Sequence, residues 1–223
     1  MKIKIKNGYI FVETDTSEKL FDNLRKGREL DVKQVVVFMN TTGDVFNPNE
    51  QRQFEEYVGS GVAMLAIHSA CDTEHEYTNG RHEWPWIHEY VGAFFLRHPM
   101  PHNTQIMRIS DREHPSTAHL PERWSKHSEW YSFVYHRSMA NNRILIDLTY
   151  DSTEEPAVQA NYNNDALRTI RGRGYNHPFC WCHERLPGRM FYTSLGHMRE
   201  SYQEDPLFIE HVEKALMWCA NDA

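Results

Sequence analysis

The strongest constraint on the fold lies in residues 34–68, where an apolar run, a helix start and a second apolar run follow one another. Gln34–Met39 reads QVVVFM, a continuous apolar run with β-branched residues, which is typical of a buried parallel strand. Asn47–Glu50 supplies an N-cap, a proline and an acid, which predicts a helix to about Val58. Val62–Ile67 is a second buried strand. Because a helix joins these two strands, we expect them to be parallel with a right-handed crossover.

The rest of the chain continues the alternation of strand and helix signals. Asn7-Gly8 between two short apolar runs indicates a hairpin, Ser17–Lys26 a short helix, and Asp205-Pro206 the start of a last helix that runs to about Ala220. The polar, acidic stretch Asp151–Asn164 is interpreted as a surface excursion, so we expect one domain over residues 1–223. The pattern predicts an α/β fold with a largely parallel sheet. Further strands are expected at Gln105–Ile109, Trp130–Tyr135, Arg143–Leu148, Phe179–Cys182 and Arg189–Ser194.

Charge and hydropathy exclude two classes of partner. A formal net charge of −7 leaves no basic surplus to neutralise phosphates, which argues against nucleic acid as the main partner. No apolar run reaches the roughly 18 residues that a membrane-spanning helix needs. The start, MKIKIKNGYIF, is basic but lacks the apolar segment of a signal peptide. We therefore expect a cytoplasmic protein.

Three apolar runs are each followed directly by polar residues. Asn40 follows QVVVFM, His68 follows VAMLAI, and Gly196-His197 follows RMFYTSL. In open α/β sheets ligands bind beyond the carboxyl ends of the strands, so these three points are expected to converge on one crevice. The alternative for His68 is a core histidine that a backbone carbonyl satisfies.

Other histidines and aromatics cluster in short segments. Glu129 is followed by Trp130 and Tyr131, and a carboxylate beside two aromatic rings suits a sugar, whose C–H face packs on the rings. The alternative is a Trp–Tyr pair in the core beside a solvated Glu. His98 and His183 lie in two further clusters, the second of which continues to Gly188-Arg189.

Metal binding is a further hypothesis. Several neutral histidines with one carboxylate suit Zn²⁺ or another divalent transition metal. No H-E-x-x-H motif is present, so this hypothesis depends on clustering in space. The closest cysteine pair, Cys180 and Cys182, is C-x-C rather than C-x-x-C, and with Cys71 and Cys219 we expect free thiols.

Taken together, six strings in order resemble the ThuA-like (trehalose utilisation) family over roughly Asp31 to Trp218. They are FMNTTGDVFNPNEQRQFEEYVGSG, AIHSACDT, EYVGAFFLRHP, DREHPSTAHLPERW, EWYSF and GRMFYTSLGH. The resemblance implies a flavodoxin-like three-layer sandwich, similar to class I glutamine amidotransferases, with a mostly parallel sheet. It also implies a role in carbohydrate metabolism.

The same resemblance argues against amidotransferase chemistry. Those enzymes carry a nucleophilic cysteine on the turn after a strand, whereas here His68 or Ser69 takes that place and Cys71 lies past it. A thiolate nucleophile needs a lowered pKa and a positioned base, and no sequence feature supplies them for Cys71.

We therefore expect an enzyme acting on a sugar or an oxidised (keto) glycoside. His68 and Glu129 are the predicted proton-transfer groups, and His197 an electrophile, orienting group or metal ligand. The alternative is a carbohydrate-binding or regulatory module that kept the pocket without turnover. Residues predicted to shape the substrate pocket are His98, Trp130, Tyr131, His183 and Arg189.

The N-terminus departs from the family pattern. The usual first strand, loop and helix are missing or reduced to Met1–Lys6. Ile3 and Ile5 alternate with lysines, which suits a strand with one wet face rather than a buried centre. We expect this segment at a sheet edge, with a rearranged strand order and an open edge that serves a homodimer. The alternative is that the natural protein has a further segment upstream of this sequence.

Overall fold

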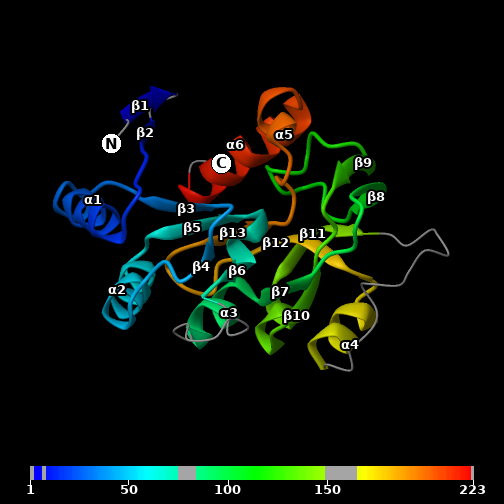
Figure 1. Ribbon diagram of the computed structural model, residues 1–223, viewed down its shortest axis with the longest axis horizontal. Helices are drawn as coiled ribbons and strands as arrows, with labels where there is room; N and C mark the ends of the chain where they lie inside the picture. The colour runs from blue at the N-terminus through cyan, green and yellow to red at the C-terminus, as the bar shows by residue number, and fades with distance from the viewer. Residues whose placement is uncertain (1–2, 7–8, 75–83, 149–164, 222–223) are drawn as a thin grey trace.

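A computed structural model describes residues 3–6, 9–74, 84–148 and 165–221, and Asp151–Asn164 lies outside them. The chain forms an α/β fold around one seven-stranded sheet (Figure 1). The helices are α1 (Ser17–Glu29), α2 (Pro48–Gly59), α3 (Pro85–Val91), α4 (Asp165–Gly172), α5 (Arg199–Gln203) and α6 (Pro206–Cys219). The strands of the large sheet, in spatial order, are β3 (Val35–Met39), β5 (Ala63–Ile67), β13 (Met190–Thr193), β12 (Pro178–His183), β11 (Arg143–Leu148), β8 (Asn103–Ile109) and β9 (Arg123–Ser128).

The large sheet is mixed rather than largely parallel. The pairs β3–β5 and β5–β13 are parallel, whereas the other four adjacent pairs are antiparallel. The expected parallel strand–helix–strand unit is therefore present, but parallel pairing covers only one half of the sheet. Short connections explain the other half, since β8 and β9 are neighbours in the chain and need no crossover helix.

The described part of the N-terminal segment does not form an edge of the large sheet, contrary to the prediction. β1 (Ile3–Lys6) forms a hairpin with β2 (Tyr9–Val12), as the Asn7-Gly8 signal indicated. Within the described residues β1 pairs with no strand of the large sheet, and β3 forms its edge instead. A strand of four residues with alternating lysines cannot be buried on both faces, which is consistent with a separate hairpin.

Helices cover both faces of the sheet, and a smaller layer completes one of them. Rings of Phe38 on β3 and Phe54 on α2 lie 5.5 Å apart, and the indole of Trp181 donates to the carbonyl of Val91 on α3, so α2 and α3 share a face. The opposite face packs on α6, where the ring of Phe191 contacts Trp218. The small sheet of β7 (Ala93–Arg97) and β10 (Ser132–Tyr135) lies on the α3 side (Figure 1).

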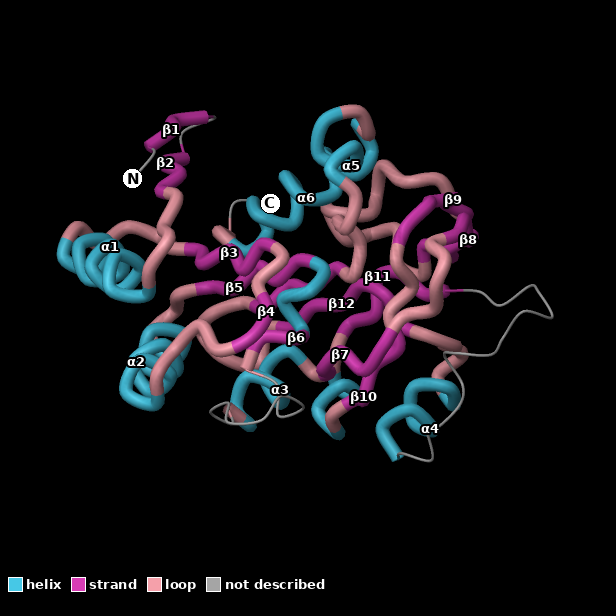
Figure 2. The backbone as a smooth tube through the Cα atoms, in the orientation of Figure 1, coloured by secondary structure: helices cyan, strands magenta, loops and turns pink. Residues whose placement is uncertain are grey.

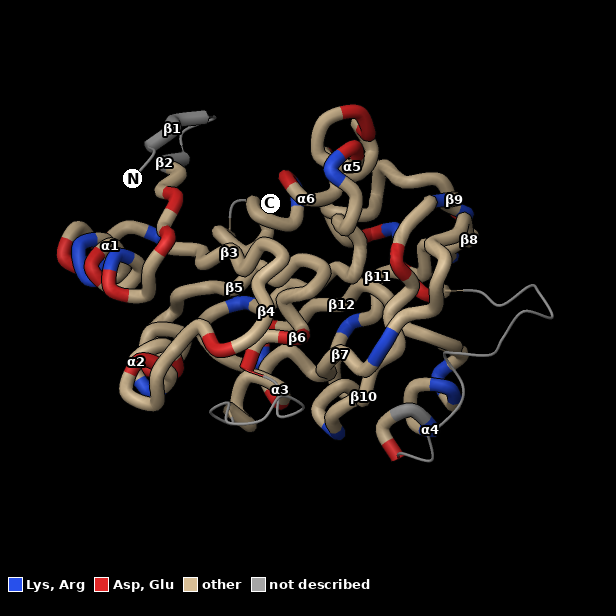
Figure 3. Tube along the Cα trace, in the orientation of Figure 1, with Lys and Arg blue, Asp and Glu red and all other residues tan. Residues whose placement is uncertain are grey.

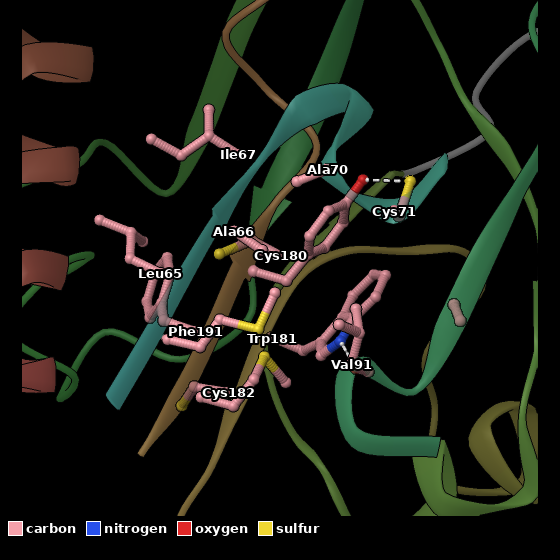
Figure 4. Packing of buried hydrophobic residues seen from close by; sticks show 14 of the residues in the cluster. Leu65, Ala66, Ile67, Ala70, Cys71, Val91, Cys180, Trp181, Cys182 and Phe191 are labelled. Carbon is pink, nitrogen blue, oxygen red and sulfur yellow. Dashed lines mark hydrogen bonds between the residues drawn. The ribbon is translucent and has the colours of Figure 1, made fainter. Parts of the chain in front are cut away.

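The core next to the ends of β5 and β13 is aromatic and sulfur-rich (Figure 4). All four cysteines are buried free thiols. The hydroxyl of Tyr192 donates to Sγ of Cys71 at 3.0 Å, and burial raises the pKa of this thiol to about 12. Cys71 is therefore a neutral core residue at pH 7 and no thiolate nucleophile.

Candidate functional site

The ends of three parallel strands converge as the sequence predicted. The backbone N–H of Asn40, just after β3, donates to the carbonyl of Ile67 at the end of β5. The side-chain amide of Asn40 donates to the carbonyl of Gly196 at 3.2 Å, which ties the β3 end to the segment after β13. These contacts fix the carboxyl edge of the parallel half of the sheet, where His68 and His197 follow β5 and β13.

His68 occupies an unusual backbone position. Its φ is +55°, in the left-handed region that non-glycine residues seldom adopt, and it opens the short 3₁₀ helix His68–Cys71 directly after β5. Such a sharp strand-to-helix turn presents one side chain at the top of the sheet, and strained backbone of this kind is concentrated at functional sites.

Glu129 is the centre of the cluster that forms there. One oxygen, Oε2, lies 3.2 Å from Nε2 of His68 and 3.3 Å from Nδ1 of His197. The other oxygen, Oε1, lies 3.2 Å from Nε2 of His102 and 3.5 Å from Nε2 of His98. Four imidazoles therefore surround one carboxylate, and we call these five residues the His/Glu cluster.

Loops carry all the cluster residues other than His68. His98 and His102 lie in the connection between β7 and β8, and Glu129 lies in the connection between β9 and β10 (Figure 2). The indole of Trp130 donates to the carbonyl of Asn103 at 2.9 Å, which holds the chain beside His102. The cluster is thus assembled from four separate segments by the folded sheet.

Burial is graded across the cluster. The side chain of His68 is 4% exposed and that of Glu129 10%, whereas those of His98 and His102 are each 24% and that of His197 31% exposed. His68 is thus the floor and the other three histidines form the rim. Burial lowers the pKa of His68 to about 4 and also lowers the pKa of His197, so the floor imidazole is neutral at pH 7.

Tyr131 holds the ring of His68. Its hydroxyl lies 3.3 Å from Nδ1 of His68, and the two ring centroids are 4.4 Å apart. Burial, and then the neighbouring Cys71 and Glu129, raise the pKa of Tyr131, so the phenol stays protonated. Nε2 of His68 is buried and has no hydrogen-bond partner, although Oε2 of Glu129 lies 3.2 Å away. The contact therefore lacks hydrogen-bond geometry, and the nitrogen is available to another ligand.

Three residues predicted to shape the substrate pocket do not join the cluster. Trp130 is buried, with its ring 5.2 Å from that of Phe179, as in the core alternative. His183 pairs with Met190 at the opposite end of β13, and its Nε2 lies 2.6 Å from the carbonyl of Tyr90.

Arg189 also lies at that far end of the sheet. It donates to the carbonyl of Trp218 at 2.6 Å and lines a hollow of about 120 Å³ with Gln34 and Gly61. The expectation is corrected because β12 runs antiparallel to β13, which carries residues after β12 away from His68.

His102 was missed by sequence reasoning. It stands four residues after His98 in the string HPMPH, and the Met100–Pro101 peptide bond between them is cis. The signal was the repeated histidine at this short spacing. Two histidines four residues apart usually indicate a site when a helix carries them, and the two prolines exclude a helix here.

The histidine-rich carboxylate cluster lies at the carboxyl ends of the parallel strands, which is where proteins with open α/β sheets bind their ligands. The chain belongs to the ThuA family, described as trehalose utilisation, whose profile matches residues 2–219. Membership implies a role in the utilisation of trehalose or related carbohydrates.

Solved structures support this assignment at the level of the fold. A ThuA-like protein from Bacteroides uniformis superposes with a TM-score of 0.69 at 20% identity, over 96% of this chain and 78% of that one. A second, from Parabacteroides merdae, gives 0.55 at 18% identity, over 84% and 70%. A cytoplasmic protein of Salmonella typhimurium gives 0.55 at 13% identity, over 98% and 94%. No curated protein matches the sequence, and no helix within the described ranges is long and apolar enough to cross a membrane.

Proposed function

We propose that the protein is an enzyme of carbohydrate metabolism that processes a sugar or an oxidised (keto) glycoside at the His/Glu cluster, assisted by a divalent metal ion. The observation that carries the proposal is the convergence of four histidines on Glu129, with a buried nitrogen of His68 that has no hydrogen-bond partner. Family membership supplies the substrate class.

His68, His197 and Glu129 are the proposed ligands of the ion. Their ligand atoms lie within 4.8 Å of one another. Two ligands held about 2.0–2.1 Å from a tetrahedral ion are themselves about 3.3–3.4 Å apart, close to the 3.2 and 3.3 Å separations at Oε2 of Glu129. With a proton on Nδ1, His68 donates to Tyr131 and directs the lone pair of Nε2 into the cluster, as ligating histidines commonly do.

This assignment replaces proton transfer by His68, because a nitrogen that binds an ion cannot carry a proton. When bound, a divalent ion supplies a Lewis acid that polarises a carbonyl oxygen and lowers the pKa of a bound water. The exposed rim of His98, His102 and His197 faces the substrate, and Tyr131 positions His68. The protein would then share the sandwich scaffold of glutamine amidotransferases without their thiol chemistry.

Turnover of keto-glycosides by the zinc-loaded protein tests the proposal. We expect glycoside cleavage that chelator treatment abolishes and added Zn²⁺ restores. Sugar binding without turnover, with or without metal, would instead identify the alternative, a carbohydrate-binding or regulatory module.

We also propose a cytoplasmic homodimer with a small-molecule ligand. Acidic and basic residues are interspersed along α1 and α2 (Figure 3), which favours a small ligand over nucleic acid. Val37 and Met39 on the edge strand β3 are 38% and 54% exposed, which suits pairing with a second copy. Light scattering tests this: a dimer that Met39→Lys converts to monomer supports it, and a wild-type monomer refutes it.

A further inference from the structure

The carboxylate of Glu129 has two faces, and each faces two imidazole nitrogens. Nε2 of His98 and Nε2 of His102 lie near Oε1, whereas His68 and His197 lie near Oε2. We propose that the cluster binds two divalent metal ions bridged by Glu129, the second on His98 and His102. This inference rests on the proposed function, because the first ion is the one proposed there.

The distances at the second position fit an ion as well as those at the first. Nε2 of His102 lies 3.2 Å and Nε2 of His98 lies 3.5 Å from Oε1 of Glu129, and the three ligand atoms lie within 4.8 Å of one another. These two separations lie on either side of the distance of about 3.3–3.4 Å that is expected between two ligand atoms of a tetrahedral ion. Two-metal sites usually hold their ions about 3.5–4 Å apart, a spacing that a carboxylate bridging through its two oxygens permits.

The unpartnered nitrogen of His68 argues against a purely hydrogen-bonded cluster. If four neutral imidazoles simply donated to Glu129, Nε2–H of His68 would point at Oε2. Instead Nε2 is buried and makes no hydrogen bond, and its side chain is 4% exposed. A buried polar atom left unsatisfied is destabilising, and an ion in front of its lone pair removes that cost. The carboxylate of Glu129 then binds the ion instead of accepting a hydrogen bond from His68. Its second oxygen is free to bind a second ion together with His98 and His102.

Each position keeps room for a substrate oxygen. Three protein ligands leave a fourth tetrahedral position open, which distinguishes catalytic zinc sites from closed structural ones. His98 and His102 are each 24% exposed and the second position has no ligand as deeply buried as His68, so the second ion would be the more easily lost.

Metal stoichiometry tests the inference. Chelator-treated protein is dialysed against Zn²⁺. Bound zinc per chain is then measured by inductively coupled plasma mass spectrometry. We expect two ions in the wild type, one in His102→Gln, one in His68→Asn and no tight ion in Glu129→Gln. Asparagine is chosen at position 68 because it tolerates the positive φ of this residue. The matched control is His127→Gln, an exposed histidine outside the cluster, which keeps two ions.

A spectroscopic readout locates the pair. Two Co²⁺ ions that share a carboxylate couple magnetically, so the fully loaded protein should give a weak electron paramagnetic resonance signal. His102→Gln should restore the strong signal of a single ion. One zinc per wild-type chain, unchanged by His102→Gln and lost in His68→Asn, would overturn the second site and leave the proposed function standing. No zinc in the wild type would overturn both.

Discussion

The hydroxyl of Tyr131 lies 3.3 Å from Nδ1 of His68, whose other ring nitrogen, Nε2, lies 3.2 Å from Oε2 of Glu129. This contact holds the ring orientation of His68 at the floor of the cluster. Tyr131→Phe keeps the ring packing but removes the oxygen, so we expect zinc affinity to fall about 10–100-fold. The free energy of unfolding should change by only about 1 kcal/mol. Competition with a chromophoric chelator measures the affinity, and urea unfolding measures the stability.

Tyr57→Phe is the matched control for that substitution, because Tyr57 lies on α2, away from the cluster. Its affinity for zinc should equal that of the wild type. Equal affinity in Tyr131→Phe as well would show that the hydroxyl does not position His68.

Removing the central charge should separate function from folding. Glu129→Gln keeps the shape of the side chain but loses the anionic ligand, so we expect a loss of zinc affinity larger than that of Tyr131→Phe and no detectable turnover. Circular dichroism and gel filtration should match the wild type, because the residue lies outside the hydrophobic core. Unfolding of this variant would point to a structural role, and normal zinc binding would remove Glu129 from the site.

Two glycines with nearly the same φ offer a further test. Gly196 has φ of +111° and Gly61 has φ of +110°. A Cβ at Gly196 would lie 2.5 Å from the hydroxyl of Tyr202 and 2.9 Å from Cγ2 of Ile67, whereas a Cβ at Gly61 meets nothing within 4 Å. Both substitutions to alanine should lower the free energy of unfolding by about 1 kcal/mol or more through backbone strain. Only Gly196→Ala should also weaken zinc binding, since it displaces the neighbouring His197.

Titrations of both glycine variants alongside urea unfolding provide the measurement. Equal zinc affinity in Gly196→Ala and Gly61→Ala would show that the turn after β13 does not set the position of His197.

Acid should destabilise the fold through core histidines outside the cluster. Burial lowers the pKa of His114, His183 and His211 to about 4, from an ordinary value near 6.5. The unfolded chain therefore binds more protons between pH 6.5 and pH 4. Stability is fully present above about pH 6.5 and falls as the pH drops to about 4, by up to about 1.4 kcal/mol per pH unit for each histidine.

Urea unfolding at several values between pH 7.5 and pH 4.5 measures this slope. His183→Gln retains a donor for the carbonyl of Tyr90 but cannot titrate, so its slope should be shallower than that of the wild type. His127→Gln, at an exposed site, should leave the slope unchanged. A pH-independent midpoint in the wild type would contradict the burial of neutral histidines.

Local sequence signals predicted the helices and strands well wherever such signals are present. The Asn47 side chain accepts from the backbone of Asn49 and Glu50, and Glu50 accepts from the backbone of Asn47, which is the capping box that begins α2. β11 spans Arg143–Leu148 as predicted. By contrast, β9 reads RWSKHS, a polar strand at the sheet edge whose residues carry no apolar run to reveal it.

The residues of the cluster were more predictable from the sequence than the residues expected to surround it. His68 and His197 were predictable because each comes after a buried parallel strand, His68 directly after β5 and His197 four residues after the end of β13. His183 and Arg189 were misplaced, since the direction of β12 depends on long-range pairing that a single segment does not encode. Trp130 follows Glu129 in the chain but turns into the core, because neighbouring residues of an extended segment point in opposite directions.

The two halves of the cluster differ in how they could arise. His68 and His197 depend on β5 and β13 lying side by side, so that half is inseparable from the sheet. His98 and His102 share one five-residue turn, HPMPH, outside the regular strands. A change in this single loop could add or delete the His98 and His102 half while the scaffold stays intact. If the proposed two-ion site is correct, members of one family could therefore differ in metal content through a very short stretch of chain.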